Sequence, residues 1–256
     1  METILRSLFS PVENLGSFLF YLRYIFTHLW KRPFRHKLVL QQIEFIGNQS
    51  VMIIILTGFF TGAVFGLQIG GVFTIFQAES MMGGATGLAL AMELGPLVTG
   101  FLLAGRVGSA MTAEIATMVV GEQVDALESM GVDPVHYLIV PRVIASIIVM
   151  PLLCGIFMIM GTYGAFIIGV VLFDVDQGIF FEKLLFLVHP PDVMTGLRKM
   201  LVFSVIISTV CCRHGLHAGG GAKGVGDSTT NAVVKSLLAI LAFDFIISFI
   251  EVRWLR

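Results

Sequence analysis

Charged residues are scarce in this 256-residue sequence: aspartate, glutamate, lysine and arginine together make up 13% of it. Soluble globular domains carry about 25% charged residues and about 45–50% apolar ones. Here the apolar share is 56% and the mean hydropathy is +0.92, so the charge is too sparse to cover a water-facing surface. This composition excludes a soluble enzyme, a disordered tail and a secreted disulfide scaffold, and it indicates an integral membrane protein.

Cysteine is also rare, and the sequence has no excess of basic over acidic residues. Cys154, Cys211 and Cys212 form no C-x-x-C pair, so the sequence predicts neither a disulfide framework nor a structural zinc site. His214 and His217 follow the cysteine pair closely, but packing is favoured over metal binding there. The formal net charge of -1 gives no attraction for nucleic acid. We expect no metal, no cofactor in this chain and no nucleic-acid partner.

Long apolar runs occupy most of the remaining sequence. Residues 51–76 contain no charge and would form a helix of about 39 Å, enough to cross a hydrocarbon core of about 30 Å. We expect five membrane-spanning helices, at about residues 51–76, 85–113, 143–173, 193–212 and 232–250. The fourth is the weakest because Arg198 and Lys199 lie near its start. The sequence therefore predicts an all-α integral membrane protein.

The first fifty residues have a different character. They hold six of the sixteen basic residues: Arg6, Arg23, Lys31, Arg32, Arg35 and Lys37. The aromatic stretch from Phe18 to Trp30, interrupted by Arg23 and His28, is typical of an interfacial helix lying on a membrane. No apolar region with a small-residue cleavage site opens the chain, so we expect no cleaved signal peptide. We predict a single domain over residues 1–256, with an N-terminal arm (1–50) and a transmembrane bundle (51–256).

The distribution of basic residues predicts an orientation. Five spans place the two termini on opposite sides of the membrane. With the N-terminus inside, the arm, the 106–142 region and the 213–235 loop carry 11 Lys and Arg, against 5 on the outside. The positive-inside rule therefore favours a cytoplasmic N-terminus and an external C-terminus.

The predicted first span has two notable faces. One carries glycine at every fourth position: Gly58, Gly62, Gly66 and Gly70. Such a bare ridge favours tight helix packing, with a groove floor for a lipid chain as the alternative. An adjoining face carries apolar side chains at helical spacing: Phe65, Ile69, Phe73 and Phe76. These either line a lipid groove or face bulk lipid.

Glu93 is the most informative single residue. An ionisable side chain within a membrane span costs about 2.5–3.5 kcal/mol on insertion scales, so it usually faces a bundle interior or a wet cavity. Pro96 removes a backbone hydrogen bond three residues later and favours a kink. The alternative places Glu93 in water at the end of the span. Asp244 in the last span is a second candidate, paired with Lys235 or capping a polar seam.

A short polar stretch separates the second and third spans. Acidic residues recur there at every third position: Glu122, Asp125 and Glu128. Apolar residues repeat that spacing beside them: Val124, Leu127 and Met130. Gly131 suits a helix C-cap and Pro134 prevents continuation. The pattern predicts a short amphipathic helix, which either connects the spans in solvent or docks into a groove on a cytoplasmic partner.

Two glycine-rich segments lack the motifs of enzymes. GGGAKGVG, from Gly219 to Gly226, does not match G-x-x-x-x-G-K-[ST] and is no nucleotide-binding loop. Ser109 lies in GRVGSA, which is not the G-x-S-x-G elbow of hydrolases. We expect no catalytic residue, so any ATP hydrolysis must take place in another chain.

The central third of the sequence carries a long series of motifs. They are Glu93-Leu94-Gly95-Pro96, Leu103 to Ala110, Ala113-Glu114, Glu122-Gln123, Asp125 to Leu127, Met130 to Pro134 and Pro141-Arg142. This series resembles the MlaE-type permease family, the membrane subunits of ATP-binding-cassette (ABC) systems that move phospholipid between bacterial membranes. The resemblance is weaker in Gly66-Leu67-Gln68 and in the stretch 221–234.

The resemblance implies an assembly in the bacterial inner membrane. It implies a homodimer, a cytoplasmic ABC ATPase dimer that binds the ATP and magnesium, a STAS-domain regulatory protein, and a periplasmic MCE-domain protein. The short helix would be the coupling helix that docks on the ATPase, with these residues: Glu122, Asp125, Leu127, Glu128, Met130, Gly131 and Asp133. Glu93 would lie near a phospholipid cavity at the dimer interface, together with Phe65, Ile69 and Phe73.

Two segments depart from the family pattern. Met92 precedes the ELGP motif where a basic residue is common, and Asp227 and Asn231 flank a Thr-Thr pair where arginines are common. Lipid or ATPase contacts of those basic residues do not carry over. We expect a permease subunit whose lipid cavity opens and closes as a partner hydrolyses ATP. The alternatives are a scaffold that anchors an MCE-domain protein and an ATPase without transport, and an ion-coupled transporter using Glu93 and Asp244.

Overall fold

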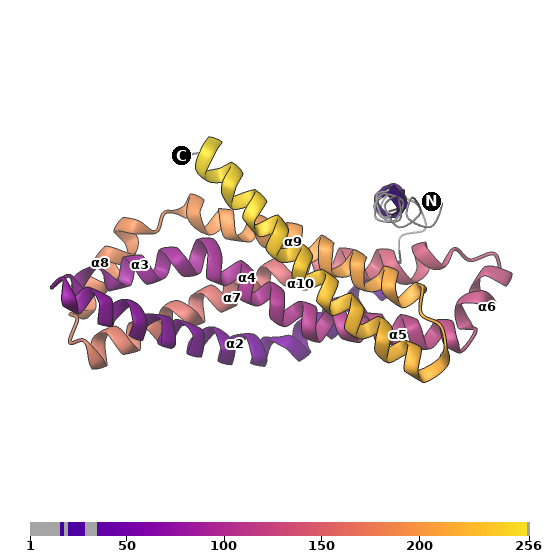
Figure 1. The fold of residues 1–256 in the computed structure, drawn as a ribbon, viewed down its shortest axis with the longest axis horizontal. Helices are drawn as coiled ribbons and strands as arrows, with labels where there is room; N and C mark the ends of the chain where they lie inside the picture. The colour runs from indigo at the N-terminus through magenta and orange to yellow at the C-terminus, as the bar shows by residue number, and fades with distance from the viewer. Residues whose placement is uncertain (1–15, 18–19, 29–34, 255–256) are drawn as a thin grey trace, which may run out of the picture.

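A computed structural model describes residues 16–17, 20–28 and 35–254 (Figure 1). Within these ranges every regular element is helical, and the helices form an elongated bundle. Five helical stretches of the described chain are long and apolar enough to cross a membrane: His36–Ile75, Glu79–Val120, Val135–Leu172, Pro190–Leu216 and Gly221–Arg253. The expected all-α fold with five spans is confirmed, whereas the orientation in the membrane stays a prediction.

The spans are longer than their apolar runs. Helix α2 (His36–Ile75) begins at His36 rather than at Val51, so it includes the end of the predicted N-terminal arm. Helix α10 (Gly221–Trp254) begins at Gly221, which makes most of the predicted 213–235 loop helical. An apolar run marks only the part of a helix that lies in hydrocarbon, whereas backbone hydrogen bonding continues through the polar turns at either end.

The second span is interrupted by two π-helical segments. Its elements are η1 (Glu79–Met81), α3 (Met82–Ala89), η2 (Leu90–Leu94), α4 (Gly95–Leu103), η3 (Ala104–Gly108) and α5 (Ser109–Val120), of which η2 and η3 are π-helical. Pro96 lies in the first turn of α4, directly after η2. The irregularity expected at Pro96 is therefore a widened turn just before the proline, a feature that often accompanies functional sites.

Two short helices lie at opposite ends of the bundle (Figure 1). Helix α6 (Gln123–Ser129) follows α5 and leads through η4 (Val135–Ile139) into α7 (Val140–Leu172). Helix α8 (Gln177–Leu187) connects α7 to α9 (Pro190–Leu216) and was not predicted. Its signal in the sequence is Asp176, whose carboxylate accepts hydrogen bonds from the N–H groups of Gly178 and Ile179 at 2.8 and 3.1 Å.

The glycine ridge of α2 packs against α7. A Cβ added at Gly62 would lie 1.8 Å from the carbonyl oxygen of Gly161, and one at Gly58 would lie 3.0 Å from that of Phe157. Farther along, Gly66 meets Ala165 on α7. These contacts bring the two backbones together, so α7 covers the ridge and leaves no space on it for a lipid chain.

Replacement of Gly62 tests this close approach. We expect Gly62→Ala to lower the free energy of unfolding by about 1–3 kcal/mol, because the added methyl group must push two backbones apart. Gly71→Ala is the matched control, since its Cβ would meet nothing within 4 Å. SDS titration of the purified protein measures both; equal stability of the two variants would contradict the packing assignment.

The helical residues 20–28 pack against the end of the bundle that carries α6. Ile25 is fully buried in a cluster with Val124 of α6. The hydroxyl of Tyr24 donates a hydrogen bond to Asp133 at 2.7 Å, and His28 lies 3.7 Å from the same carboxylate oxygen. One side of the predicted interfacial helix is thus held by protein, and its location in the membrane interface stays a prediction.

The carboxyl group of Asp133 gives this contact a pH dependence. Burial acts to raise its pKa. Hydrogen bonds from Tyr24 and from the backbone of Val135 and His136, with the nearby charge of His28, outweigh burial and lower the pKa below its ordinary value of 3.8. A lowered pKa in the folded state means that the carboxylate stabilises the contact above the ordinary pKa. This stabilisation is lost as the pH falls through the lowered value.

We therefore expect amide exchange of residues 20–28, corrected for intrinsic rates, to accelerate as the pH falls below 3.8. Tyr24→Phe should weaken protection by about fivefold at neutral pH, equivalent to about 1 kcal/mol for one hydrogen bond. Tyr24→Phe should also make the exchange rate of residues 20–28 depend less on pH in the acid range. Asp125→Asn, which alters an exposed carboxylate on α6, serves as control. A pH profile identical in wild type and Tyr24→Phe would contradict the assignment.

Candidate functional site

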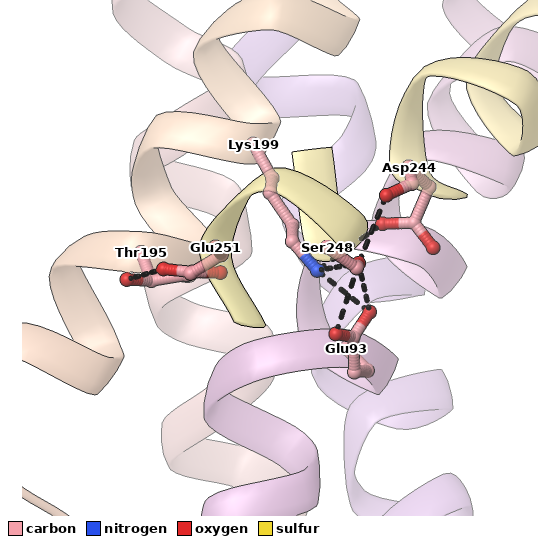
Figure 2. Close-up of polar contacts among 6 residues, drawn as sticks. All are labelled: Glu93, Thr195, Lys199, Asp244, Ser248 and Glu251. Atoms are coloured by element: carbon pink, nitrogen blue, oxygen red, sulfur yellow. Dashed lines mark hydrogen bonds and ion pairs between the residues drawn. The ribbon is translucent and has the colours of Figure 1, made fainter. Parts of the chain in front are cut away.

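Three spans bring ionisable side chains together inside the bundle (Figure 2). Glu93 comes from η2, Lys199 from α9, and Asp244 and Ser248 from α10. We refer to these four residues as the charged cluster. Because Asp244 and Ser248 are four residues apart on α10, they lie on the same face of that helix.

Lys199 is the centre of the charged cluster. Its side chain is fully buried, and its Nζ atom lies 2.7 Å from Oε2 of Glu93 and 3.4 Å from Oδ1 of Asp244. The same ammonium group donates a hydrogen bond to Oγ of Ser248 at 2.8 Å. One cation therefore contacts groups from both neighbouring spans and links η2 and α10 to α9.

Ser248 connects the charged groups further. Its hydroxyl lies 3.2 Å from Oε1 of Glu93 and 2.9 Å from the backbone carbonyl oxygen of Asp244. A serine hydroxyl carries a single proton, so it donates to one of these acceptors at a time. Beyond the cluster, Thr195 of α9 donates to Glu251 of α10 at 2.5 Å, which adds a second polar contact between the two helices.

The charges of the cluster do not cancel. With all groups ionised, one ammonium group faces two carboxylates, and this leaves one negative charge. A buried lysine in a membrane span requires such partners, since an unpaired charge there is strongly unfavourable. Glu93 differs from Lys199 in exposure: 45% of its side chain is accessible, against 0% for Lys199. Lys199 and Ser248 thus hold the carboxylate of Glu93 on its inner side, and the rest of the side chain is accessible from outside the bundle.

Two members of the charged cluster, Glu93 and Asp244, were predicted from the sequence, whereas Lys199 and Ser248 were missed. Glu93 and Asp244 were expected to be important, whereas Lys199 was assigned to the margin of its span. The pairing of Asp244 with Lys235 is wrong, because nine residues of α10 separate them by about 2.5 turns and place them on opposite faces. Lys199 lies well inside α9, four residues after the buried Thr195. In the sequence, this four-residue spacing of two polar residues is the sign that both lie on one face of the helix.

The apolar residues expected near Glu93 are only partly brought together. Phe65 lines a small pocket of about 340 Å³ between α2 and the second span, and Leu94, which follows Glu93, lines the same pocket. Ile69 and Phe73 are half-buried on the next turns of α2 and are not among its lining residues. The pocket therefore places one of the three predicted side chains beside the η2 segment.

The amphipathic helix predicted at Glu122–Met130 is present as α6, one residue shorter at each end. Glu122 precedes the helix with a φ of 57°, and Gly131 follows it with a φ of 73°, the left-handed conformation that glycine adopts at helix ends. Val124 is buried and Leu127 half-buried. Among the other side chains expected to dock, Glu122, Asp125, Glu128 and Met130 are exposed. The helix thus presents an acidic face to its surroundings. Asp133 lies beyond the end of α6, is half-buried and accepts the hydrogen bond from Tyr24, so it faces residues 20–28.

The two helices that flank α6 are fixed to each other. Nη2 of Arg142, near the start of α7, lies 2.8 Å from Oε2 of Glu114 on α5. Nη1 of Arg142 donates to the carbonyl oxygen of Leu138 at 2.6 Å. Sequence analysis assigned no role to this pair, which joins α5, η4 and α7 into one unit behind α6.

Metal-binding geometry is not found in the part of the chain that the structure describes. No group of three or more His, Cys, Asp or Glu side chains there could hold an ion. Cys154, Cys211 and Cys212 are buried free thiols. Buried free thiols behave as small apolar side chains, so these cysteines are packing residues.

Comparison with known proteins gives a consistent result. The family model described as "Permease MlaE" matches residues 39–250. A probable ABC transporter permease protein of Rickettsia felis is 42% identical over 236 residues, covering 92% of this chain and 91% of its own. A probable ABC transporter permease protein of Synechocystis is 40% identical, covering 93% and 90%. The chloroplastic protein TRIGALACTOSYLDIACYLGLYCEROL 1 of Arabidopsis thaliana is 39% identical, covering 82% and 60%.

The fold and the site define a multi-pass membrane protein with a charged cluster between its spans. The chain belongs to the MlaE permease family, the permease subunits of ABC transporters. Membership of an ABC transporter implies an ATPase partner in the same system. The family resemblance seen in the sequence motifs is thereby confirmed.

The cluster predicts non-additive effects on stability. Glu93→Gln or Asp244→Asn alone should lower the free energy of unfolding by about 1 kcal/mol, because Lys199 keeps one carboxylate. The double variant leaves the buried ammonium without a counter-charge and should lose about 3–5 kcal/mol. SDS titration measures all three, with the exposed Glu128→Gln as control. Strict additivity of the two single effects would contradict the shared role of Lys199.

Proposed function

We propose that this chain is the permease subunit of an ABC transporter that moves phospholipid between bacterial membranes. Two copies would enclose a lipid cavity that opens and closes with ATP hydrolysis by a partner. The observation that carries the proposal is the half-exposed carboxylate of Glu93 in the charged cluster, together with a small pocket that Phe65 and Leu94, the residue after Glu93, line. A wall that combines fixed charge with apolar surface suits an amphipathic ligand.

The exposure of Glu93 supports a second copy. An ionised carboxylate that faces bulk hydrocarbon is strongly unfavourable, so this surface needs a cover of protein, water or a lipid headgroup. Helix α10 is the least covered of the five spans and carries exposed aromatic side chains, among them Phe245 and Phe249. A homodimer that joins these surfaces would enclose Glu93 of each copy in a shared cavity.

Lipid as the cargo has support of another kind. The name of the Arabidopsis relative refers to a glycolipid, trigalactosyldiacylglycerol. That relative is chloroplastic, and the Rickettsia and Synechocystis relatives are bacterial. We place this chain in a bacterial inner membrane, with the N-terminus in the cytoplasm as the positive-inside rule favours.

The cytoplasmic partner would bind at α6. In the proposed orientation the acidic face of α6 meets the ABC ATPase, which holds the ATP and magnesium. The ion pair between Arg142 and Glu114 would pass the movement of α6 to α5 and α7 together. ATP can shift this equilibrium only if it binds the closed ATPase dimer more tightly than the open one. A STAS-domain protein on the cytoplasmic side and an MCE-domain protein on the periplasmic side complete the proposed assembly.

Lipid transfer by the reconstituted transporter tests the proposed function. We expect ATP-dependent movement of labelled phospholipid between proteoliposomes and acceptor vesicles. Glu93→Gln, which keeps the shape and removes the charge, should reduce the rate by about tenfold, and Glu93→Ala should reduce it further. The Lys199 cation then remains paired with Asp244, so both variants should still assemble.

Three outcomes separate the alternatives. Wild-type transport that persists without any ATPase would favour an ion-coupled transporter over the proposal. ATP hydrolysis without lipid movement would favour a scaffold that only anchors its partners. Unchanged transfer by Glu93→Gln and Glu93→Ala would remove Glu93 from the lipid path.

The docking role of α6 gives a separate prediction. Reversal of charge at Glu122, Asp125 and Glu128 to lysine should weaken co-purification of the ATPase by at least tenfold, because the acidic face becomes basic. Asp125→Lys alone should have a smaller effect. Glu182→Lys on α8, an exposed reversal at the opposite end of the bundle, is the matched control. Full ATPase association by the triple variant would contradict the coupling assignment.

A further inference from the structure

A large apolar pocket lies on a different part of the chain from the charged cluster. It has a volume of about 720 Å³ and lies between α7, α8 and the start of α9. Tyr163 and Phe166 of α7 form one wall, and Phe181 and Leu184 of α8 form another. The floor includes Gly155, where an added Cβ would meet nothing within 4 Å.

The surroundings of the pocket indicate that it opens into hydrocarbon. Helices α7 and α9, which both contribute lining residues, are long and apolar enough to span a membrane. Around it α8 exposes large apolar side chains: Phe181, Leu185 and Phe186 are 47%, 75% and 70% accessible. Such a surface would be unstable in water, and lipid chains are its natural environment.

We propose that this pocket binds one acyl chain of a membrane phospholipid, as a lateral lipid site separate from the charged cluster. The proposal goes beyond the proposed function, because it requires a membrane but neither an ATPase nor transport. Its volume lies within the range of about 300–1,000 Å³ typical of sites for single small ligands.

The dimensions favour a lipid chain over a helix from a partner protein. A helix about 10 Å across would fill this volume with only about six residues, whereas a spanning helix has about 20. On α7 the lining residues run from Gly155 to Phe166, about 17 Å along the helix axis. His189 lies at the rim with 65% of its side chain accessible, so a polar headgroup finds a partner at that end.

The pocket also reaches the interior of the bundle at one point. Ala91 of η2 and Met158 of α7 line its inner end. Gly196 of α9 packs closely against both, since a Cβ at that position would lie 2.0 Å from the carbonyl oxygen of Ala91 and 2.7 Å from Cε of Met158. Glu93 lies two residues after Ala91 and Lys199 three residues after Gly196. A bound acyl chain would therefore contact the outer side of the same η2–α9 contact that holds the charged cluster.

Photolabelling tests the site directly. The complex is purified from its native membrane and placed in nanodiscs that contain phosphatidylethanolamine with a diazirine at the end of one acyl chain. Peptide mapping after illumination should find at least fivefold more label per residue on the residues that line the pocket than on exposed residues of α7 outside it, Ile148, Leu152 and Val171. Label no higher in the pocket than on these exposed residues overturns the proposal, and so does protection of the pocket by a partner's membrane helix.

A space-filling variant provides the matched comparison. Gly155→Leu places a side chain in the pocket without a backbone clash and should reduce wall labelling at least fivefold. Gly71→Leu makes the same change at an exposed site on α2 and should leave it unaltered. Equal labelling of the two variants overturns the proposal. If Gly155→Leu fails to fold, the photolabelling map of the wild-type protein still tests the proposal. None of these results depends on lipid transfer.

Discussion

A fully buried lysine between membrane spans is the constraint on which the rest of the site depends. The ammonium group of Lys199 has no access to water, so its charge must be compensated within the chain. Glu93 and Asp244 supply that compensation from two other helices. The cluster therefore fixes how η2, α9 and α10 lie relative to one another, and any movement between them must re-form these contacts.

The two sides of the bundle differ in how tightly they are packed. Helices α2 and α7 meet backbone to backbone along the glycine ridge, where Gly62 and Gly161 leave no space for a side chain. Helix α10 is held by a few buried apolar residues, Ala232 and Ile240 among them, and by the polar contacts of Ser248 and Glu251, and most of its apolar segment is exposed. A tightly packed pair beside a loosely covered helix suits a protein in which one side moves or meets a second copy.

The sequence predicted the architecture well because five apolar runs are each long enough to cross a membrane. The predicted spans were too short, since helical hydrogen bonding in α2 and α10 extends beyond the apolar region. Helix α6 was predicted from the spacing of its acidic residues together with Gly131. Helix α8 was missed because its apolar run is short and its N-cap, Asp176, was not weighed.

The site could be predicted only in part. Glu93 and Asp244 stand out as charges within apolar runs, and a single sequence is enough to identify them. Lys199 lies near the start of its apolar run, and its four-residue spacing from Thr195 shows only that the two share a helix face; that this face is buried depends on the rotation of α9 relative to η2. The Arg142–Glu114 pair and the pocket at Gly155 depend in the same way on contacts between helices that are far apart in the sequence.

The central claim is that this chain works with an ATPase to move phospholipid. Mass spectrometry of the complex, purified gently from its native membrane, tests it most directly by identifying both the proteins and the lipids. The account predicts that ATPase and MCE-domain chains co-purify with phospholipid enriched above the bulk membrane. A chain that purifies alone, with lipid of bulk composition, would contradict it.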